Sequence, residues 1–467
     1  MSDYRIWIDG KAVEGASEIS VVNPATEEVF ATVARSGPEQ LEQAIASAKA
    51  AQKEWAKTSI AVRRDALKAI SKGINDRADE IARVQTMEQG KPMAESIGEV
   101  ELTQAFLDHF TTFDLPVEVL VDDEEKRVEV HRMPLGVVAC IVPWNFPLLI
   151  GAHKVALALL AGNTCVLKPA PTAPITSAIF AEICAGVLPP GAVNTVNDEN
   201  DLGDVLTAHP DVAKVTFTGS TATGKKIMAN AAGTLKRLTL ELGGNDAAIV
   251  LPDVDVEDTA AKLFGAAFLN CGQVCIGLKR TYVHESIYDE MCDALAKLAD
   301  AAVVGDGLEE GTEIGPIHNK MQFEKVSRFL ENARQAGTIV TGGDVPDQKG
   351  FFIQPTIIRD VKDGDEIVDV EQFGPIMPVI KYSDIDDVIE RANASDYGLG
   401  GSVWSRDLAK AKEIALQIDC GTTWINKHLD FGPNVPFGGC KRSGIGVEFA
   451  EEGFYEFTQV RVINQAK

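Results

Sequence analysis

The sequence predicts an α/β protein with two successive α/β units and a small additional β unit. From Gly136 onward, short runs of β-branched residues alternate with amphipathic segments of helical period. This alternation is typical of right-handed βαβ units, which build a parallel sheet covered on both faces. A second block with the same alternation begins near Ala247. The length of 467 residues suits about three domains of ~150 residues, and 45% hydrophobic residues are ordinary for a packed globular protein.

Helical patterns come first along the chain. Apolar residues recur at helical spacing from Leu41 to Trp55 and again from Leu67 to Val84. An acidic stretch at 116–131 alternates with a period of two, which predicts exposed strands joined by a charged turn. Residues 460–464 form a late strand pattern with no helix after it. We expect these last two segments to pair as the small third unit.

The strands of the first α/β unit are predicted at 137–142, 165–169, 212–219 and 237–244, with helices between them. The second unit repeats the pattern from AAIVL (247–251) to TTWIN (422–426). No repeat of 20–50 residues is apparent, so a solenoid is excluded.

Charge and cysteine usage exclude several classes of function. The chain has 44 basic and 69 acidic residues, a net charge of −25. Such a field repels phosphate backbones and anionic lipids, so we expect neither nucleic-acid nor membrane partners. No apolar run approaches the ~18 residues of a membrane span, and the N-terminus shows no secretory signal. Eight cysteines without paired zinc spacing predict a cytoplasmic protein with no metal site.

Two residues stand out as candidates for covalent chemistry. Cys275 in CGQVC follows Gly272-Gln273 and lies outside any apolar period, which indicates an exposed thiol in a loop. Such a thiol is a strong nucleophile once its pKa falls below ~8.5. Glu241 in LELGGN ends a predicted strand before a glycine turn, at the sheet edge where ligands bind. Apolar neighbours would raise its pKa, as suits a general base; the alternative is an edge carboxylate in water.

Two further stretches are candidates for ligand contacts. In PWNFP (143–147), prolines hold Asn145 rigidly, and its amide can donate to an oxyanion; a plain turn asparagine is the commoner reading. In FTGSTATGKK (217–226), a strand leads through Ser220 into a helix whose N–H groups form an anion site. The spacing matches neither a dinucleotide fingerprint nor a Walker loop. Lys168 is a further cation at the same sheet edge.

Seven motifs in order carry a family resemblance: PWNFP, KPA, FTGS, LELGG, GQVC, EQFGP and PFGGCKRSG. From about Ile8 to the C-terminus the chain resembles the NAD(P)-dependent aldehyde dehydrogenase superfamily, in its non-acylating, hydrolytic branch. The resemblance implies a Rossmann-like cofactor domain (1–115 and 134–240) and an α/β catalytic domain (241–445). It also implies a small β oligomerisation arm (116–133 and 446–467) that completes a sheet across a homodimer or homotetramer.

The resemblance also implies roles for individual residues. Cys275 matches the nucleophile that forms a thiohemiacetal and then a thioester. Asn145, with the backbone N–H of Cys275, matches the oxyanion hole. Glu241 matches the base for thioester hydrolysis, and Glu448 matches a second carboxylate in proton relay. The positions that match cofactor contacts are Trp144, Lys168, Gly219, Ser220, Glu371 and Phe373.

The choice between the two cofactors depends on opposing signals. Pro171 stands where many NAD-using relatives have a glutamate that repels the 2′-phosphate of NADP. Asp198, Glu199 and Asp201 lie near the expected adenosine end and disfavour extra negative charge. We expect NAD, with NADP as the alternative.

The substrate positions favour apolar aliphatic or aromatic aldehydes. Phe146, Phe431 and Phe437 match the aromatic walls of relatives; the alternative is that they are core residues, and it is strongest for Phe437. His153 matches a position that holds Trp or, in carboxylate-recognising relatives, Arg, and it is a poor anchor for a carboxylate. Succinate semialdehyde is therefore ranked lower. Three alternatives stay open: an acylating enzyme that uses coenzyme A, a cysteine hydrolase, and a non-catalytic protein.

Overall fold

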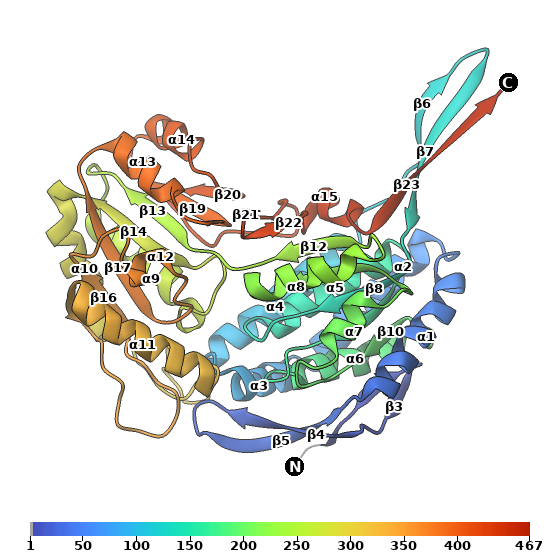
Figure 1. Ribbon diagram of the computed structural model, residues 1–467, viewed down its shortest axis with the longest axis horizontal. Coiled ribbons are helices and arrows are strands. Elements are labelled where there is room, and N and C mark those ends of the chain that lie inside the picture. Colours follow the sequence, from blue (N-terminus) through green and yellow to red (C-terminus); the bar gives the residue numbers. More distant parts are fainter. Residues whose placement is uncertain (1–2) are drawn as a thin grey trace.

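The computed structural model describes residues 3–467, which form two sheet-bearing halves and a projecting arm (Figure 1). In the first half, β8 (Val137–Ile141), β9 (Thr164–Lys168), β10 (Val193–Thr195), β11 (Val212–Thr218) and β12 (Arg237–Glu241) run parallel. Their order is β10-β9-β8-β11-β12, and β22 (Gly444–Ile445) adds an antiparallel edge. The order reverses between β8 and β11, and ligands of open α/β sheets bind at such a switch point.

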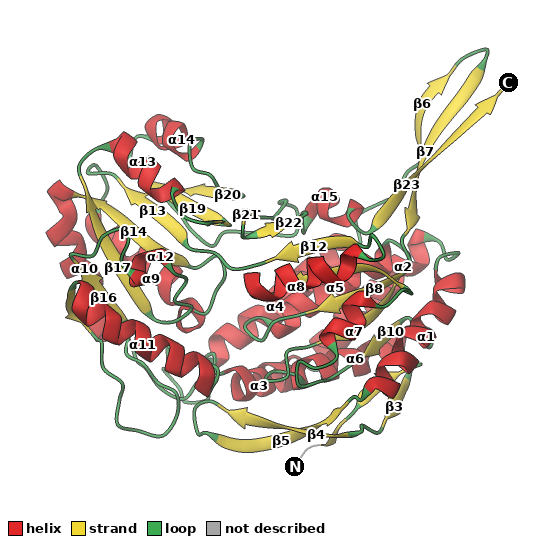
Figure 2. Ribbon diagram, in the orientation of Figure 1, coloured by secondary structure: helices red, strands yellow, loops and turns green. Residues whose placement is uncertain are grey.

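Both faces of this sheet are buried, as parallel pairing predicts. Val138 and Cys140 of β8 join one apolar cluster, whereas Val137 and Ala139 join another on the opposite face. Helices cover the two faces (Figure 2). They are α1 (Pro38–Trp55), α2 (Ile60–Asp76), α3 (Ala78–Gln89), α4 (Met93–Phe110), α5 (Pro147–Leu160), α6 (Ile175–Val187), α7 (Gly203–Ala208) and α8 (Thr221–Ala232).

The second half contains a sheet of seven strands in the order β15-β16-β17-β14-β13-β19-β20. The pairs are parallel except β15 with β16, and the order reverses between β13 and β19. The strands are β13 (Asp246–Val250), β14 (Leu278–His284), β15 (Thr338–Thr341), β16 (Thr356–Arg359), β17 (Ile376–Tyr382), β19 (Gly400–Trp404) and β20 (Thr422–Ile425). Its helices are α9 (Val256–Phe268), α10 (Tyr288–Ala301), α11 (Lys320–Ala336), α12 (Glu366–Asp369), α13 (Ile385–Asn393) and α14 (Leu408–Ala415). The predicted α/β fold class is confirmed.

The arm is a three-stranded antiparallel sheet that projects from the body (Figure 1). It consists of β6 (Glu118–Asp122), β7 (Lys126–Pro134) and β23 (Thr458–Ala466), in the order β23-β7-β6. Val462 faces Val130, so the late strand pairs with the acidic stretch as the alternation predicted. Between β22 and β23, α15 (Ala450–Tyr455) packs on α5 in the body, with Phe454 fully buried.

The N-terminal strands were not predicted from the sequence. β1 (Asp3–Tyr4), β2 (Ile6–Ile8), β3 (Lys11–Val13), β4 (Ser17–Asn23) and β5 (Glu28–Arg35) precede the first helix. They are short or half-exposed, so their apolar periodicity is weaker than that of the helices after them. Two short strands, β18 (Tyr397–Gly398) and β21 (Cys440–Lys441), pair with each other. Within residues 3–467, no helix has the length and apolar character to cross a membrane.

Candidate active site

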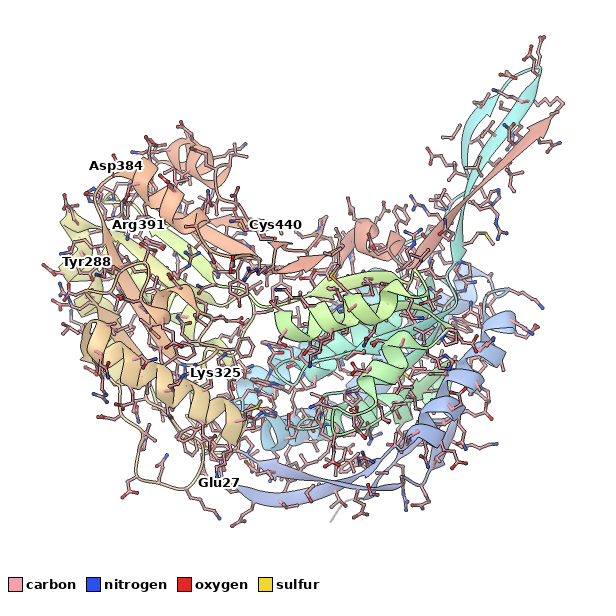
Figure 3. The ribbon with its side chains drawn as sticks, viewed as in Figure 1. Glu27, Tyr288, Lys325, Asp384, Arg391 and Cys440 are labelled. Atoms are coloured by element: carbon pink, nitrogen blue, oxygen red, sulfur yellow. The ribbon has the colours of Figure 1, made fainter. Side chains whose placement is uncertain are left out.

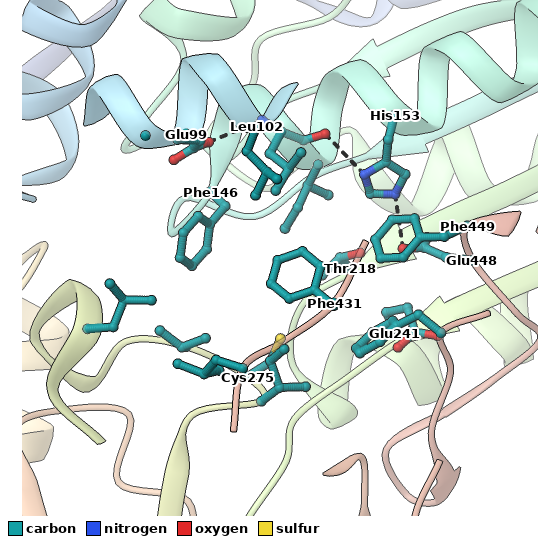
Figure 4. Close-up of a pocket in the computed structure, with 18 of the residues that line it drawn as sticks. Glu99, Leu102, Phe146, His153, Thr218, Glu241, Cys275, Phe431, Glu448 and Phe449 are labelled. Atoms are coloured by element: carbon teal, nitrogen blue, oxygen red, sulfur yellow. Dashed lines mark hydrogen bonds and ion pairs between the residues drawn. The ribbon is translucent and has the colours of Figure 1, made fainter. Parts of the chain in front are cut away.

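Two cavities meet at Cys275, between the carboxyl ends of the first sheet and the second half of the molecule. The first has a volume of about 330 Å³ and an almost wholly apolar lining (Figure 4). The second, of about 230 Å³, lies beside the start of α8. Cys275 and Thr218 line both cavities. The sulfur therefore faces two compartments of different chemical character.

The chain reaches Cys275 through a loop of unusual backbone conformation. Asn270 and Cys271 have positive φ angles of 50° and 56°, and Gly272 follows at 72°. Such conformations cost roughly 1–3 kcal/mol in non-glycine residues and cluster at functional sites. A turn then closes with a hydrogen bond of 3.0 Å from the Gly277 N–H to the Val274 carbonyl, and Cys275 is its second residue.

The thiol does not have the lowered pKa that the loop position led us to expect. Cys275 is half-buried, and burial raises its pKa to about 12, with the nearby Glu371 carboxylate adding to the effect. This corrects the picture of an exposed, readily ionised thiol. Without a ligand, the sulfur holds its proton at neutral pH, so reaction requires a nearby base or a change in the charges around it.

Glu241 has the properties expected of a buried base. It is the last residue of β12, it is 2% exposed, and it lines the first cavity with Cys275. Neither carboxylate oxygen has a hydrogen-bond partner among residues 3–467. Burial raises the pKa of Glu241 well above its ordinary value, and the Glu448 charge raises it further. An edge carboxylate in water, the alternative reading, does not fit this environment.

Glu448 lies in the same cavity, but its pKa is shifted in the opposite direction. Its Oε2 is 3.0 Å from His153 Nε2 (Figure 4), and its Oε1 pairs with Lys154. Burial opposes ionisation of Glu448, but Lys154 and His153 outweigh it and lower the pKa. The surroundings therefore shift the pKa values of these two neighbouring carboxyl groups in opposite directions. Such a difference is typical of pairs in which one group acts as acid or base and the other stays ionised.

His153 is fixed by both ring nitrogens. Nδ1 lies 3.0 Å from the Leu149 carbonyl oxygen, which only accepts, so Nδ1 donates its proton there. Nε2 then faces Glu448. The side chain is 2% exposed and lines the cavity, but its polar atoms are already bonded within the protein.

Asn145 is buried beside the nucleophile loop. Its Nδ2 donates to the Gln273 carbonyl at 3.0 Å, and its own carbonyl accepts from Lys91 Nζ at 2.8 Å and from Asn270 Nδ2 at 3.1 Å. Lys91 is in turn paired with Glu99 at 2.6 Å. These supporting residues were missed from the sequence, because they come from separate segments that carry no shared motif.

The second cavity collects most of the predicted cofactor positions. Its lining includes Trp144, Gly219, Ser220, Glu371 and Phe373. The Ser220 hydroxyl caps α8 by accepting from the Thr223 N–H, and free N–H groups at a helix start suit a pyrophosphate. Glu371 Oε1 accepts from the Gly244 N–H at 3.1 Å, and this half-buried carboxylate suits a ribose hydroxyl.

Sequence reasoning missed three other lining residues of this cavity, all near the start of α11. They are Met321, Gln322 and Lys325, the last of which is labelled in Figure 3. Gln322 Nε2 donates to the Phe373 carbonyl at 2.8 Å, and Lys325 Nζ donates to the Glu371 carbonyl at 3.2 Å. No motif marks this amphipathic helix, so only the fold could reveal them.

Lys168 does not line either cavity. Its Nζ pairs with the fully buried Asp198 at 2.5 Å. Arg35 likewise pairs with Glu199 at 3.0 Å and Asp201 at 2.6 Å. The three carboxylates expected to repel a 2′-phosphate are therefore balanced by two cations, which weakens the electrostatic argument for NAD that we drew from the sequence.

The substrate positions predicted from the sequence all reach the first cavity. Phe146, His153, Phe431 and Phe437 line it, and Phe146 stacks over Lys91 Nζ at 3.8 Å from the ring centroid. Phe449, which the sequence did not single out, packs edge-on against His153. The aromatic rings therefore belong to a cavity wall as well as to the core.

The molecule has two α/β halves, and a cysteine lies between an apolar cavity and a second cavity beside a helix N-terminus. This is the architecture of a dinucleotide-dependent oxidoreductase. The family model described as "Aldehyde dehydrogenase family" matches residues 7–463. The chain therefore belongs to the aldehyde dehydrogenase family and is an aldehyde dehydrogenase. The predicted family and enzyme class are confirmed.

Relatives of known name span nearly the whole chain. A chloroplastic betaine aldehyde dehydrogenase of Beta vulgaris is 38% identical, over 98% of this chain and 95% of that protein. A phenylacetaldehyde dehydrogenase of Pseudomonas fluorescens is also 38% identical, with the same coverage. A solved structure of Staphylococcus aureus betaine aldehyde dehydrogenase bound to NAD+ has a TM-score of 0.96 at 32% identity, over 99% of this chain and 94% of that one.

Proposed function

We propose that this enzyme oxidises an apolar aliphatic or aromatic aldehyde to its carboxylic acid with NAD, through an acyl group held on Cys275. One observation carries the proposal: Cys275 lines both cavities. An aldehyde in the apolar cavity and a nicotinamide in the other can then approach one sulfur from two sides. Such placement converts a reaction between separate molecules into one within a complex.

The side chains support a balanced sequence of steps. The proton of Cys275 passes to solvent, and the sulfur bonds to the carbonyl carbon while the C=O pair moves to oxygen. The Asn145 amide and the Cys275 N–H stabilise that alkoxide. When bound, NAD supplies the acceptor for the hydride, which leaves a thioester on Cys275. Glu241 then takes a proton from water, the hydroxide adds to the thioester, and the C–S bond breaks to release the acid.

The lining of the first cavity supports the apolar substrate class. Four phenylalanines contribute to its wall, and the histidine there is occupied by Glu448 and Leu149. A substrate carboxylate would find no free ring nitrogen on His153, which disfavours succinate semialdehyde. In an aldehyde panel we expect the highest kcat/KM for medium-chain or aromatic aldehydes. Succinate semialdehyde as the best substrate would overturn this choice.

Hydrolysis is favoured over transfer to coenzyme A because a water-activating base is superfluous in an acylating enzyme. Glu241 is buried, its carboxylate has no hydrogen-bond partner among the described residues 3–467, and it lines the cavity that holds the thiol. Product analysis with and without coenzyme A distinguishes the two. Formation of the free acid at the same rate in both conditions is the expected result.

Two substitutions test the assigned roles. Cys275→Ala is expected to abolish turnover while cofactor binding persists, and Cys420→Ala, a half-buried cysteine outside both cavities, should keep full activity. Glu241→Gln is expected to give a burst of NADH and a steady state slower by about 10²–10⁴-fold, because the acyl-enzyme accumulates. Turnover retained in Cys275→Ala would refute the mechanism.

NAD is proposed as the cofactor because the solved relative with this fold is bound to NAD+. The residues proposed to hold it are Trp144, Lys168, Gly219, Ser220, Glu371 and Phe373. Two features weaken the repulsion of the NADP 2′-phosphate that we expected. Pro171 supplies no carboxylate, and the acidic residues near the adenosine end are paired with Lys168 and Arg35. The ratio of kcat/KM for the two cofactors decides, and a tenfold preference for NADP would reverse the assignment.

We also propose a homodimer or homotetramer that forms through the arm. In the described part of the chain, β23 and β6 pair with no strand other than β7, and exposed edges need protection. Large apolar side chains are exposed on it, among them Leu120 and Val462. The domain limits drawn from the sequence and the cytoplasmic location also stay predictions.

A further inference from the structure

A buried lysine is hydrogen-bonded to the turn that carries Cys275, and this lysine has no role in the steps proposed above. Lys279, in β14, is four residues after the cysteine and is 2% exposed. Its Nζ donates to the Val274 carbonyl at 2.5 Å and to the Gly277 carbonyl at 3.2 Å. These two carbonyls flank Cys275 and Ile276, so one ammonium joins both ends of the turn.

The contacts leave little freedom for this ammonium. The Val274 carbonyl that it binds also accepts the Gly277 N–H that closes the turn. A side chain at Gly277 would begin 2.9 Å from Lys279 Nζ, so the glycine makes room for it. On the other side, Nζ lies 5.7 Å from the centroid of the Phe373 ring, within range of a cation–π contact.

The positive charge of Lys279 acts on the Cys275 sulfur in addition to supporting the turn. The carboxylates that act on the Cys275 sulfur are Glu371, Glu241 and Asp246, and each opposes formation of a thiolate. Lys279 acts on the same sulfur in the opposite sense. Burial lowers the pKa of Lys279, and the positive charge of Lys325 lowers it further. Glu371, Asp246 and Cys275 instead favour the charged form of Lys279.

We infer that Lys279 is a positioning residue for the nucleophile: it holds the 274–277 turn and places a positive charge beside the Cys275 sulfur as that sulfur becomes anionic. The inference rests on the proposed function only in taking Cys275 as the nucleophile. The ammonium touches neither of the proposed reactants, so it acts through the cysteine. A buried cation provided in advance needs no rearrangement when charge develops.

The test measures the reactivity of one sulfur without substrate or cofactor. Iodoacetamide is added to the enzyme between pH 7 and 9, and alkylation of Cys275 is followed by mass spectrometry of its peptide, because the chain has eight cysteines. Lys279→Gln retains an N–H donor without the charge, and Lys279→Met retains neither. Lys297→Gln, an exposed lysine on α10, is the matched control.

We expect Lys279→Gln to alkylate Cys275 about tenfold more slowly across this pH range, as for a thiol pKa raised by about one unit. Lys279→Met is expected to be slower still, and Lys297→Gln unchanged. Lys279→Arg, which keeps the charge, should recover most of the rate. Thermal unfolding identifies the variants that are folded.

Wild-type alkylation rates in folded Lys279→Gln and Lys279→Met would overturn the inference. If neither neutral variant folds, Lys279→Arg decides, because a tenfold loss with the charge retained would exclude the electrostatic role. The proposed function fails separately: turnover retained in Cys275→Ala would refute it, whatever the alkylation rates show.

Discussion

At the residue scale, the site depends on two glutamates with similar burial and different partners. Glu241 has no hydrogen-bond partner for its carboxylate within residues 3–467, whereas Glu448 is bonded to Lys154 and His153. Burial alone raises a carboxyl pKa, and only a nearby positive charge reverses that effect. The partners therefore decide which glutamate is available to accept a proton.

Removing the Glu448 charge should make Glu241 a stronger acid. Glu448 raises the pKa of Glu241, second only to burial, and its effect exceeds the opposing effect of Lys154. In Glu448→Gln, the pH at which thioester hydrolysis reaches half its maximal rate is therefore expected to move to lower pH. The measurement is the steady-state rate against pH with a substrate whose acyl-enzyme accumulates.

Glu448→Gln leaves Lys154 buried without its carboxylate, which can destabilise the fold by about 3–5 kcal/mol. The double variant Lys154→Met/Glu448→Gln avoids this and should shift the profile in the same direction. A shift to higher pH in both proteins would contradict the proposed role of Glu241.

At the element scale, the loop between α9 and β14 shows why the nucleophile position is rigid. Gly272 has a φ of 72°, and a Cβ atom there would collide with the backbone carbonyl of Gly374. Gln273 stabilises the same loop through two hydrogen bonds. Its Nε2 donates to the Asn270 carbonyl, and its Oε1 accepts from the His318 N–H. The loop is thus held by backbone contacts from two sides.

Two glycine-to-alanine substitutions, seven residues apart, should have opposite effects. Gly272→Ala is expected to lower the free energy of unfolding by about 1–3 kcal/mol and to reduce turnover strongly, because the loop must move. Gly265→Ala lies on an exposed face of α9 with nothing within 4 Å of the new Cβ, and should stabilise by about 0.5–1 kcal/mol. Denaturant unfolding measures both, and equal effects would contradict the structure.

A buried glutamate couples α3 to the start of α6. Glu88 accepts from the N–H groups of Ile175 and Thr176, each at 2.8 Å, and it is fully buried. Burial raises the pKa of Glu88 to about 7. Because the folded state binds this proton more tightly than the unfolded chain, the stability that protonation gives is complete below about pH 4.5 and is lost as pH rises towards 7.

Glu88→Gln should remove this pH dependence. Between pH 4.5 and 7, the stability of the wild type relative to the variant is expected to fall by about 3 kcal/mol. Chemical denaturation at several pH values gives the difference, with Glu310→Gln, an exposed glutamate, as the control. A constant difference across this range would show that Glu88 is ionised throughout.

At the scale of the whole molecule, the arm is a small sheet whose apolar side chains stay exposed to solvent in a single chain. β23 is exposed from Gln459 onward, and Val460 and Val462 are 45% and 55% exposed. A three-stranded sheet without a covered face is marginal alone, so contact with a second copy would stabilise it. The net charge of −25 opposes association, so the contact must be specific.

Charged residues on the arm should separate the subunits. The double variant Val460→Asp/Val462→Asp places two carboxylates on one face of β23 and is expected to sediment as a 50.1 kDa species, while the wild type sediments as a dimer or tetramer. Leu235→Asp, at a side chain that is 90% exposed outside the arm, is the matched control. A wild-type protein that sediments only as a monomer would refute the proposed assembly.

Much of the fold could be predicted because its signals are local. Strand 137–141 is a continuous apolar run, strand 164–168 has an apolar centre at Cys165–Leu167, and β7 alternates, so each has a recognisable pattern. The five N-terminal strands could not be predicted, because they are short and half-exposed. At the site, Cys275, Glu241 and Asn145 lie in distinctive motifs, whereas Lys279 has no motif around it that indicates its contacts.

The sequence by itself determined the α/β class, the pairing of the late strand with the acidic stretch, and the family, since each depends on periodicity or on the order of short motifs. The tertiary structure alone decided which partners the charged groups have: within residues 3–467 the carboxylate of Glu241 has no hydrogen-bond partner, Glu448 is bonded to Lys154, and Lys168 is bonded to Asp198. The physical reason is that a pKa depends on burial and on charges brought together from distant segments, and neither is written in the local pattern.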